Sequence, residues 1–198
     1  MRESGVFDLV NIDPSTTYKS TEKLLSTGKV RAIGVSNFTI NRLEDLLAKT
    51  DVIPAVNQVE AHPYLQQPAL FDFRKSKNIL IQAYSPLRNN QTGEPRTVDD
   101  ELVGVLGRRL GMDGGQLLAT WERGTVVLPK SVTPHRLKSN LQVKELPKGT
   151  FEELSALKRH KRINQQSRWG FDIFEEIDEG KVREIAEGAE ENKEKFTV

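Results

Sequence analysis

The chain has 198 residues, of which 36% are hydrophobic and 29% charged, and its formal net charge at pH 7 is +1. This length fits one domain with a buried core, and the near-neutral charge argues against nucleic acid as the main partner. The absence of cysteine excludes a disulfide framework and a cysteine-based metal site. No apolar signal core and no stretch near ~18 apolar residues is present. We therefore expect a cytoplasmic protein without a metal or a membrane partner.

Four short runs of mostly apolar, often β-branched residues are predicted to be strands buried on both faces. They cover residues 30–35 (VRAIGV), 55–59 (AVNQV), 79–84 (ILIQAY) and 125–128 (TVVL). Helical patterns cover residues 21–28, with Gly28 as the expected C-cap, and residues 40–50, 68–77 and 99–111. Because strands and helices alternate, the sequence predicts a parallel sheet and an α/β fold.

Between the third and fourth runs the chain is too long for one helix and its loops. The extra stretch, residues 86–100, reads PLRNNQTGEPRTVDD and is rich in Asn, Gly and Pro. A long loop at the carboxyl end of a strand is often functional.

Polar residues follow each predicted strand, at the ends where parallel α/β folds bind ligands. They are Ser36 and Asn37, Gln58 and Glu60, Tyr84 and Ser85, and Lys130 and Ser131. Loops are polar in any case, which accounts well for Glu60 and Ser85. The polarity of loops accounts less well for Asn37, Gln58 and Tyr84, because these residues lie inside or against apolar runs.

The stretch LPKSVTPHRLKSN, residues 128–140, has the composition of a phosphate receptor. Thr133 and Pro134 are an N-cap and first-turn pair that predicts a helix to about residue 141. Arg136 and Asn140 share one face of that helix, and Lys130 and Ser131 lie just before it. Cations, hydroxyls and free amides together bind phosphate. An ordinary strand–loop–helix junction with solvated charges fits the same pattern.

Four motifs in this order, GKVRAIGVSNF, VNQVEAHPYLQQ, IQAYSPL and LPKSVTPHRLKSN, resemble the aldo-keto reductases over roughly residues 17–174. The resemblance implies a (β/α)8 barrel of the TIM type, of which this chain holds the four parallel strands of the second half with their outer helices. It also implies NADP(H) as cofactor and a small aldehyde or ketone as substrate.

The resemblance gives roles to matching positions, all on the cofactor. The nicotinamide carboxamide is assigned to Ser36, Asn37 and Gln58, the nicotinamide ring to Tyr84, and the pyrophosphate region to Ser85 and Leu87. The 2′-phosphate and adenine are assigned to Lys130, Ser131, Arg136 and Asn140, and the expected N-cap Thr133 completes the cofactor-binding set.

The catalytic residues of the family belong to the first half of its barrel. The contexts that carry its Tyr and His, Y-x-N-E and an L-I-H-W-like strand end, do not occur here, so no catalytic residue is assigned. His62 matches a non-catalytic position and is expected to be structural. We therefore expect a truncated reductase that supplies cofactor contacts. The alternative is a non-catalytic relative that binds a nucleotide or a protein, and open barrel edges would favour self-association.

The C-terminal part is expected to differ in character from the barrel. INQQSRWGFDIF, residues 163–174, resembles the family's C-terminal loop, in which Trp169 and Phe171 are candidates for an apolar substrate wall or for plain packing. From residue 172 to 195 there are ten acidic and four basic residues. We expect a partial barrel over residues 1–174 and an acidic helix or tail over residues 175–198, solvated rather than binding.

Overall fold

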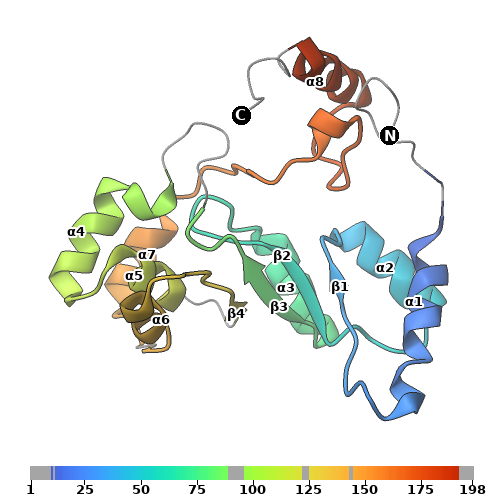
Figure 1. Ribbon diagram of the computed structural model, residues 1–198, viewed down its shortest axis with the longest axis horizontal. Helices are drawn as coiled ribbons and strands as arrows, with labels where there is room; N and C mark the ends of the chain where they lie inside the picture. The colour runs from blue at the N-terminus through green and yellow to red at the C-terminus, as the bar shows by residue number, and fades with distance from the viewer. Residues whose placement is uncertain (1–9, 11, 89–95, 122–124, 143–144, 192–198) are drawn as a thin grey trace. The chain divides into compact units, whose positions relative to one another are not determined.

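The computed structural model describes residues 10, 12–88, 96–121, 125–142 and 145–191 (Figure 1). Contacts divide the chain into two compact units. The sheet unit comprises Ala32–Ser36 and Ile53–Ile163, and the terminal unit comprises Met1–Arg31, Asn37–Val52 and Asn164–Val198. The boundary expected between residues 174 and 175 stays a prediction.

A four-stranded parallel sheet forms the centre of the sheet unit. Its strands are β1 (Val35–Ser36), β2 (Val56–Glu60), β3 (Leu80–Tyr84) and β4 (Thr125–Val127), in the order β1-β2-β3-β4. All three neighbouring pairs are parallel, and the register aligns Gln58 with Ser36 on one side and with Gln82 on the other. The predicted α/β fold with four parallel strands in sequence order is therefore confirmed.

The first strand is shorter than its apolar pattern predicts. Only Val35 and Ser36 pair as a strand, although the backbone N–H of Ala55 also donates to the carbonyl of Ile33 at 2.8 Å. The chain passes β2 closely here, because a Cβ on Gly34 would lie 2.4 Å from the Val56 side chain. Glycine permits this approach. In the described sheet β1 pairs with β2 alone. Fewer backbone hydrogen bonds are therefore available to hold a longer strand there.

The two faces of the sheet differ in exposure. Val59, Ile81 and Ala83 are buried on one face. On the other face the strands carry Gln58 and Gln82, which are partly exposed, and Leu80 and Val126, which are each 41% exposed. Alternation of this kind follows from the two-residue period of a strand.

Helices of the sheet unit supply its hydrophobic core. They are α3 (Pro68–Lys77), α4 (Glu101–Leu110), α5 (Gly114–Thr120), α6 (Pro134–Asn140) and α7 (Lys148–Ser155), with the 3-10 turn η2 (Thr97–Asp99). Figure 1 shows α4 to α7 gathered at one end of this unit, near β4. Their buried side chains include Val103, Leu106, Leu117, Leu118, Trp121 and Leu154. The Trp121 ring stacks on Phe151 with centroids 6.1 Å apart.

Local signals set most helix ends. α3 begins with Pro68, and its C-cap is Asn78, which adopts a left-handed φ of 56°. The Asp100 side chain caps the start of α4 by accepting the Leu102 N–H, and the C-cap of α4 is Gly111 with φ 64°. Gly28 is a left-handed cap as expected, but it closes a 3-10 turn rather than the predicted helix over residues 21–28.

The terminal unit contains α1 (Pro14–Glu22), η1 (Leu25–Thr27), α2 (Ile40–Lys49), η3 (Ser167–Trp169) and α8 (Glu179–Glu191). α2 matches its predicted range closely and buries Leu43 and Leu46. α8 lies in the segment expected to be an acidic helix or tail, and residues 192–198 of that segment lie outside the described part of the chain.

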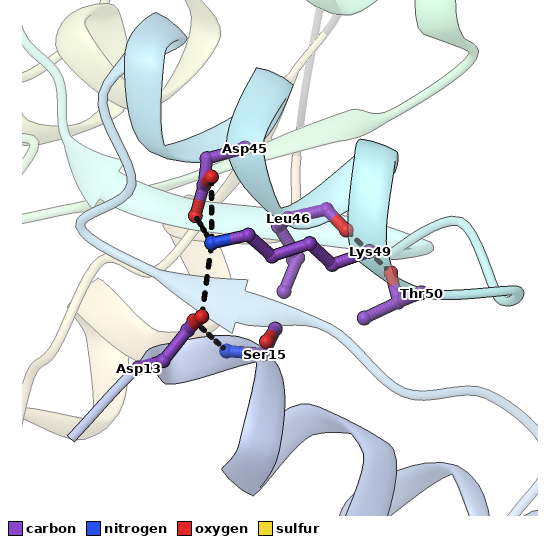
Figure 2. A network of polar contacts seen from close by, with 6 residues as sticks. All are labelled: Asp13, Ser15, Asp45, Leu46, Lys49 and Thr50. Carbon is purple, nitrogen blue, oxygen red and sulfur yellow. Dashed lines mark hydrogen bonds and ion pairs between the residues drawn. The ribbon is translucent and has the colours of Figure 1, made fainter.

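A lysine bridges α1 and α2 (Figure 2). The Lys49 Nζ lies 2.9 Å from the Asp13 carboxylate and 2.8 Å from that of Asp45. Asp13 also caps α1 through the Ser15 N–H. The hydrogen bond from Lys49, followed by that from Ser15, lowers the pKa of Asp13 to about 2. The carboxylate is therefore charged at neutral pH, when it holds the two helices together.

Within the described residues, no helix has the length and apolar character that crossing a membrane requires.

Candidate functional site

A cavity of about 620 Å³ opens at the carboxyl ends of β3 and β4. Its walls come from the segment after β3, from η2, from the start of α5, and from the segment between β4 and the end of α6. The lining residues are Ser85, Pro86, Leu87, Arg88, Arg96, Val98, Asp99, Asp113, Gly115, Leu128, Lys130, Ser131, Arg136 and Asn140. This volume is in the range of small-molecule sites in proteins.

Six residues predicted to bind the cofactor meet around this cavity. They come from two strand ends and one helix, and they are Ser85, Leu87, Lys130, Ser131, Arg136 and Asn140. The helical spacing of Arg136 and Asn140 puts both on the cavity side of α6. The Asn140 amide is held by donating to the carbonyl of Pro129 at 3.3 Å.

Thr133 differs from its expected role. It stands at the N-cap position of α6, but its side chain makes no capping hydrogen bond, and it does not line the cavity. Instead its backbone N–H donates to the Ser131 hydroxyl at 3.1 Å. A hydroxyl two residues earlier thus forms the local turn. α6 itself has seven residues and ends at Asn140, one residue before the predicted end.

The residues predicted to contact nicotinamide from the strands share one face of the sheet. Ser36 and Gln58 are register partners, and the Ser36 hydroxyl donates to the Gln58 carbonyl at 3.0 Å. The Gln58 amide donates to the side chain of Gln82. Tyr84 follows Gln82 by two residues and therefore lies on the same face.

Tyr84 keeps its proton at neutral pH. Burial, followed by the nearby Glu60 carboxylate, raises the pKa of Tyr84 to about 12. The neutral phenol ring is thus a flat, uncharged surface at the end of β3.

Three predicted site residues lie in the terminal unit. Asn37 adopts a left-handed φ of 61°, which asparagine tolerates better than most residues. The rings of Trp169 and Phe171 stack with centroids 6.4 Å apart and an interplanar angle of 29°. The stacking shows that these two side chains pack against each other.

Several lining residues were not found from sequence. Arg88, Arg96 and Asp99 come from the stretch 86–100. The length and position of this stretch indicate a functional loop, but they do not indicate which of its residues bind a ligand. Residues 89–95 of that stretch lie outside the described part of the chain. Asp113 and Gly115 begin α5, a helix that was not predicted. Its signal was the pair Asp113 and Gln116, whose spacing is that of a capping box.

The charges around the cavity leave it suited to an anion. The Arg96 guanidinium makes two hydrogen bonds of 2.7 Å to the Asp99 carboxylate and holds the pKa of Asp99 below its ordinary value. By contrast, Lys130 and Arg136 form no ion pair with any residue that the structure describes. Two cations beside the Ser131 hydroxyl and the Asn140 amide match the chemistry of a phosphate dianion.

Comparisons with known proteins identify the family of the chain. The model of the aldo/keto reductase family matches residues 8–162. An aldo/keto reductase of Synechocystis is 39% identical over 164 residues, which are 77% of this chain and 50% of the relative. A glycerol 2-dehydrogenase (NADP(+)) of Hypocrea jecorina is 41% identical over 173 residues, 83% of this chain and 54% of the relative.

A solved structure matches as well. The crystal structure of MGS-M4, an aldo-keto reductase from a Medee basin deep-sea metagenome library, superposes with a TM-score of 0.70 at 34% identity. The match covers 82% of this chain and 59% of that one. The chain thus spans about half the length of the curated relatives it matches. The matched region includes all four strands and the whole cavity, and the chain belongs to the aldo/keto reductase family.

Proposed function

We propose that this chain forms the NADP(H) site of an oxidoreductase that reduces an aldehyde or ketone to an alcohol. The observation that supports this most is the cavity at the ends of β3 and β4. There Lys130 and Arg136 face a space of about 620 Å³ that also contacts Ser131 and Asn140. Because NADP(H) differs from NAD(H) by a phosphate on the adenosine ribose, a site with two cations favours the phosphorylated cofactor.

The proposal divides the cofactor contacts along the chain. Lys130, Ser131, Arg136 and Asn140 bind the 2′-phosphate and adenine, and Ser85 and Leu87 lie along the pyrophosphate. Thr133, also predicted to bind the cofactor, contributes through its backbone N–H, which donates to the Ser131 hydroxyl. Ser36, Asn37 and Gln58 hold the nicotinamide carboxamide, and Tyr84 stacks on the ring. The common sheet face of Ser36, Gln58 and Tyr84 supports the second group.

In the proposed reaction the bound cofactor supplies a hydride for the carbonyl carbon. The residues of this chain bind and orient it. Trp169 and Phe171 are proposed as an apolar wall for the substrate, and their mutual stacking supports a rigid surface there. We propose no proton donor among the residues of this chain, and we place the reaction in the cytoplasm.

Relatives support the choice of cofactor and substrate class. The glycerol 2-dehydrogenase (NADP(+)) of Hypocrea jecorina carries the cofactor in its name. So does an NADPH-dependent D-xylose reductase of Meyerozyma guilliermondii, which is 37% identical over 166 residues, 77% of this chain and 52% of the relative. We infer a small carbonyl compound as the substrate class.

Replacing Arg136 by Ala tests the phosphate assignment. We expect NADPH binding to weaken by ~1–3 kcal/mol, the range for a charge-assisted hydrogen bond, because one of two cations facing the phosphate is lost. NADH binding should hardly change, since NADH lacks that phosphate. Fluorescence titration of both nucleotides measures the two dissociation constants.

Lys138→Ala is the matched control for this test. Lys138 is an exposed cation on the same helix and does not line the cavity, so its loss removes the same charge without touching the site. NADPH affinity should be nearly unchanged in this variant. Equal losses for NADPH and NADH in Arg136→Ala, or equal losses of NADPH affinity in the two variants, would contradict the assignment.

A second candidate is a non-catalytic relative that binds a nucleotide or another protein, including a second copy of itself. β1 and β4 each have one strand neighbour among the described strands, and Leu80 and Val126 on the less buried sheet face are each 41% exposed. Strand edges and apolar faces favour association with another chain.

We therefore expect the purified chain to have a mass above that of the 22.4 kDa monomer in solution. Size-exclusion chromatography with light scattering over a range of concentrations measures this mass. The Val126→Glu variant should shift the distribution of masses toward monomer, because it puts a charge on the less buried face of the sheet. A monodisperse monomer at high concentration would rule out self-association.

A further inference from the structure

Asp113 is an unexpected feature of the proposed phosphate site, because it puts a carboxylate that has no cation partner among the described residues into the wall of the cavity. Its Oδ1 atom accepts the backbone N–H of Gln116 at 2.7 Å and thereby caps α5. Its Oδ2 atom lies 3.3 Å from the Ser139 hydroxyl, which has one proton to donate either to this oxygen or to the Arg136 carbonyl at 3.2 Å. One oxygen is thus committed to the helix, while the other retains capacity to accept a further donor.

The second carboxylate of the cavity has a different role. Asp99 is held by two hydrogen bonds from Arg96, so its charge is neutralised locally. Asp113 has no ion pair with any residue in the described ranges of the chain. A carboxylate left without a cation beside a ligand cavity is suited to accept hydrogen bonds from the ligand.

The position of Asp113 separates it from the proposed phosphate contacts along α6. The contact with Ser139 places Asp113 at the last turn of α6, next to Asn140. Arg136 lies three residues before Ser139, a little under one helical turn earlier and roughly 4.5 Å away along the helix axis. If the phosphate of a ligand lies at Arg136, the group of the ligand that reaches Asp113 is therefore not this phosphate.

The space beside Asp113 is open and partly apolar. Gly115 lines the cavity there, and a Cβ at this position would lie 3.1 Å from Asp113 Oδ1 and 3.8 Å from a methyl of Leu87. A side chain at residue 115 would thus fill the gap between the carboxylate and Leu87. A space between an apolar side chain and one hydrogen-bond acceptor fits a heteroaromatic ring that carries an N–H donor.

We propose that Asp113 accepts a hydrogen bond from the exocyclic amino group of the nucleotide base and so makes the site selective for a 6-aminopurine over a 6-oxopurine. The inference rests on the proposed NADP(H) site. A carboxylate only accepts hydrogen bonds, and a 6-oxo group is itself an acceptor, so the oxo base sets two electronegative oxygens against each other. The hydrogen bond from the Gln116 N–H holds the carboxylate in place.

The test compares NADPH with its hypoxanthine analogue, which has a 6-oxo group in place of the 6-amino group. Dissociation constants are measured by fluorescence titration for the full 198-residue chain and for Asp113→Asn. The parent chain should prefer NADPH ~10-fold, as one charge-assisted hydrogen bond at an exposed position predicts. In Asp113→Asn the preference should fall to within ~2-fold, because an amide offers both a donor and an acceptor.

Asparagine caps helices about as well as aspartate, so Asp113→Asn should retain α5, and the thermal unfolding midpoint verifies this. Asp51→Asn makes the same chemical change at an exposed residue of the terminal unit and should leave the preference at its parent value. Equal affinity of the parent chain for the two nucleotides, or an unchanged preference in Asp113→Asn, overturns the role of Asp113 while the NADP(H) site stands. Binding of neither nucleotide overturns the proposed function and this inference together.

Discussion

The purified 198-residue chain is expected to bind NADPH without oxidising it measurably in the presence of simple aromatic aldehydes. Reduction of a carbonyl needs an acid that protonates the developing alkoxide while the hydride is transferred, and such an acid contributes ~10²–10⁴-fold to the rate. Binding of the cofactor alone supplies no such proton. The rate should therefore fall short of the complete reaction by at least that factor.

The tyrosines of the chain are poorly placed to act as this acid. Tyr18 and Tyr64 are 5% and 2% exposed, so neither presents its hydroxyl freely to a substrate. The Tyr64 hydroxyl donates to Asp100, and its ring lies 4.1 Å from the Arg159 guanidinium. Burial raises the pKa of Tyr84 to about 12, which weakens it as an acid, and the proposal uses its ring for stacking.

Absorbance at 340 nm with a saturating aldehyde measures turnover, and fluorescence titration on the same sample shows that NADPH is bound. The same mixture without protein gives the background rate. Turnover of an aldehyde at a rate typical of enzymes, ~1 per second or faster, would show that this chain contains a proton donor that the present assignment overlooks.

Some parts of this fold could be predicted from sequence because the signals are local. β2 and β3 start one residue after their predicted starts, and α3 spans its predicted range of residues 68–77. Here β-branched runs and a proline at the helix start agree with the tertiary structure. α5 was missed because it begins with two glycines, which are poor helix formers, and its stability comes from the Asp113 cap and from burial of Leu117 and Leu118.

The candidate site shows the same division. Lys130, Ser131, Arg136 and Asn140 are close in sequence, so their meeting at one cavity followed from strand and helix periodicity. Asp113 could not be placed in this way. It reaches the cavity because α5 packs beside α6, and such packing depends on side chains far apart in the chain. Asp113 was therefore missed because its position is set by helix–helix contact.

Glu60 is expected to be among the most important residues for the stability of the sheet unit. Its side chain and that of His62 are fully buried at the end of β2, with Glu60 Oε1 2.8 Å from His62 Nε2. The same oxygen accepts the backbone N–H of Ile163 at 2.9 Å. One carboxylate thus joins the sheet to a segment about a hundred residues later. These contacts account for the predicted structural role of His62.

Replacing Glu60 by Ala should destabilise the folded chain by ~2–6 kcal/mol, which is ~1–3 kcal/mol for each of two buried polar groups that lose their hydrogen-bond partner. The change leaves the Ile163 N–H and His62 Nε2 buried without their acceptor and opens a small void. Urea unfolding followed by circular dichroism measures the loss. Glu60→Gln should lose less, because an amide oxygen in the place of Oε1 still accepts hydrogen bonds from both donors.

Glu44→Ala is the control, since Glu44 is exposed on α2 and its replacement should change the free energy of unfolding by less than ~0.5 kcal/mol.

Glu60 is also the register partner of Tyr84, so loosening the end of β2 disturbs the surface proposed for nicotinamide. We therefore expect Glu60→Gln to weaken NADPH binding more than Glu44→Ala does, under conditions where both variants remain folded. If Glu60→Ala unfolds at the same urea concentration as Glu44→Ala, the buried hydrogen bonds do not hold the end of β2, because alternative acceptors must satisfy both donors.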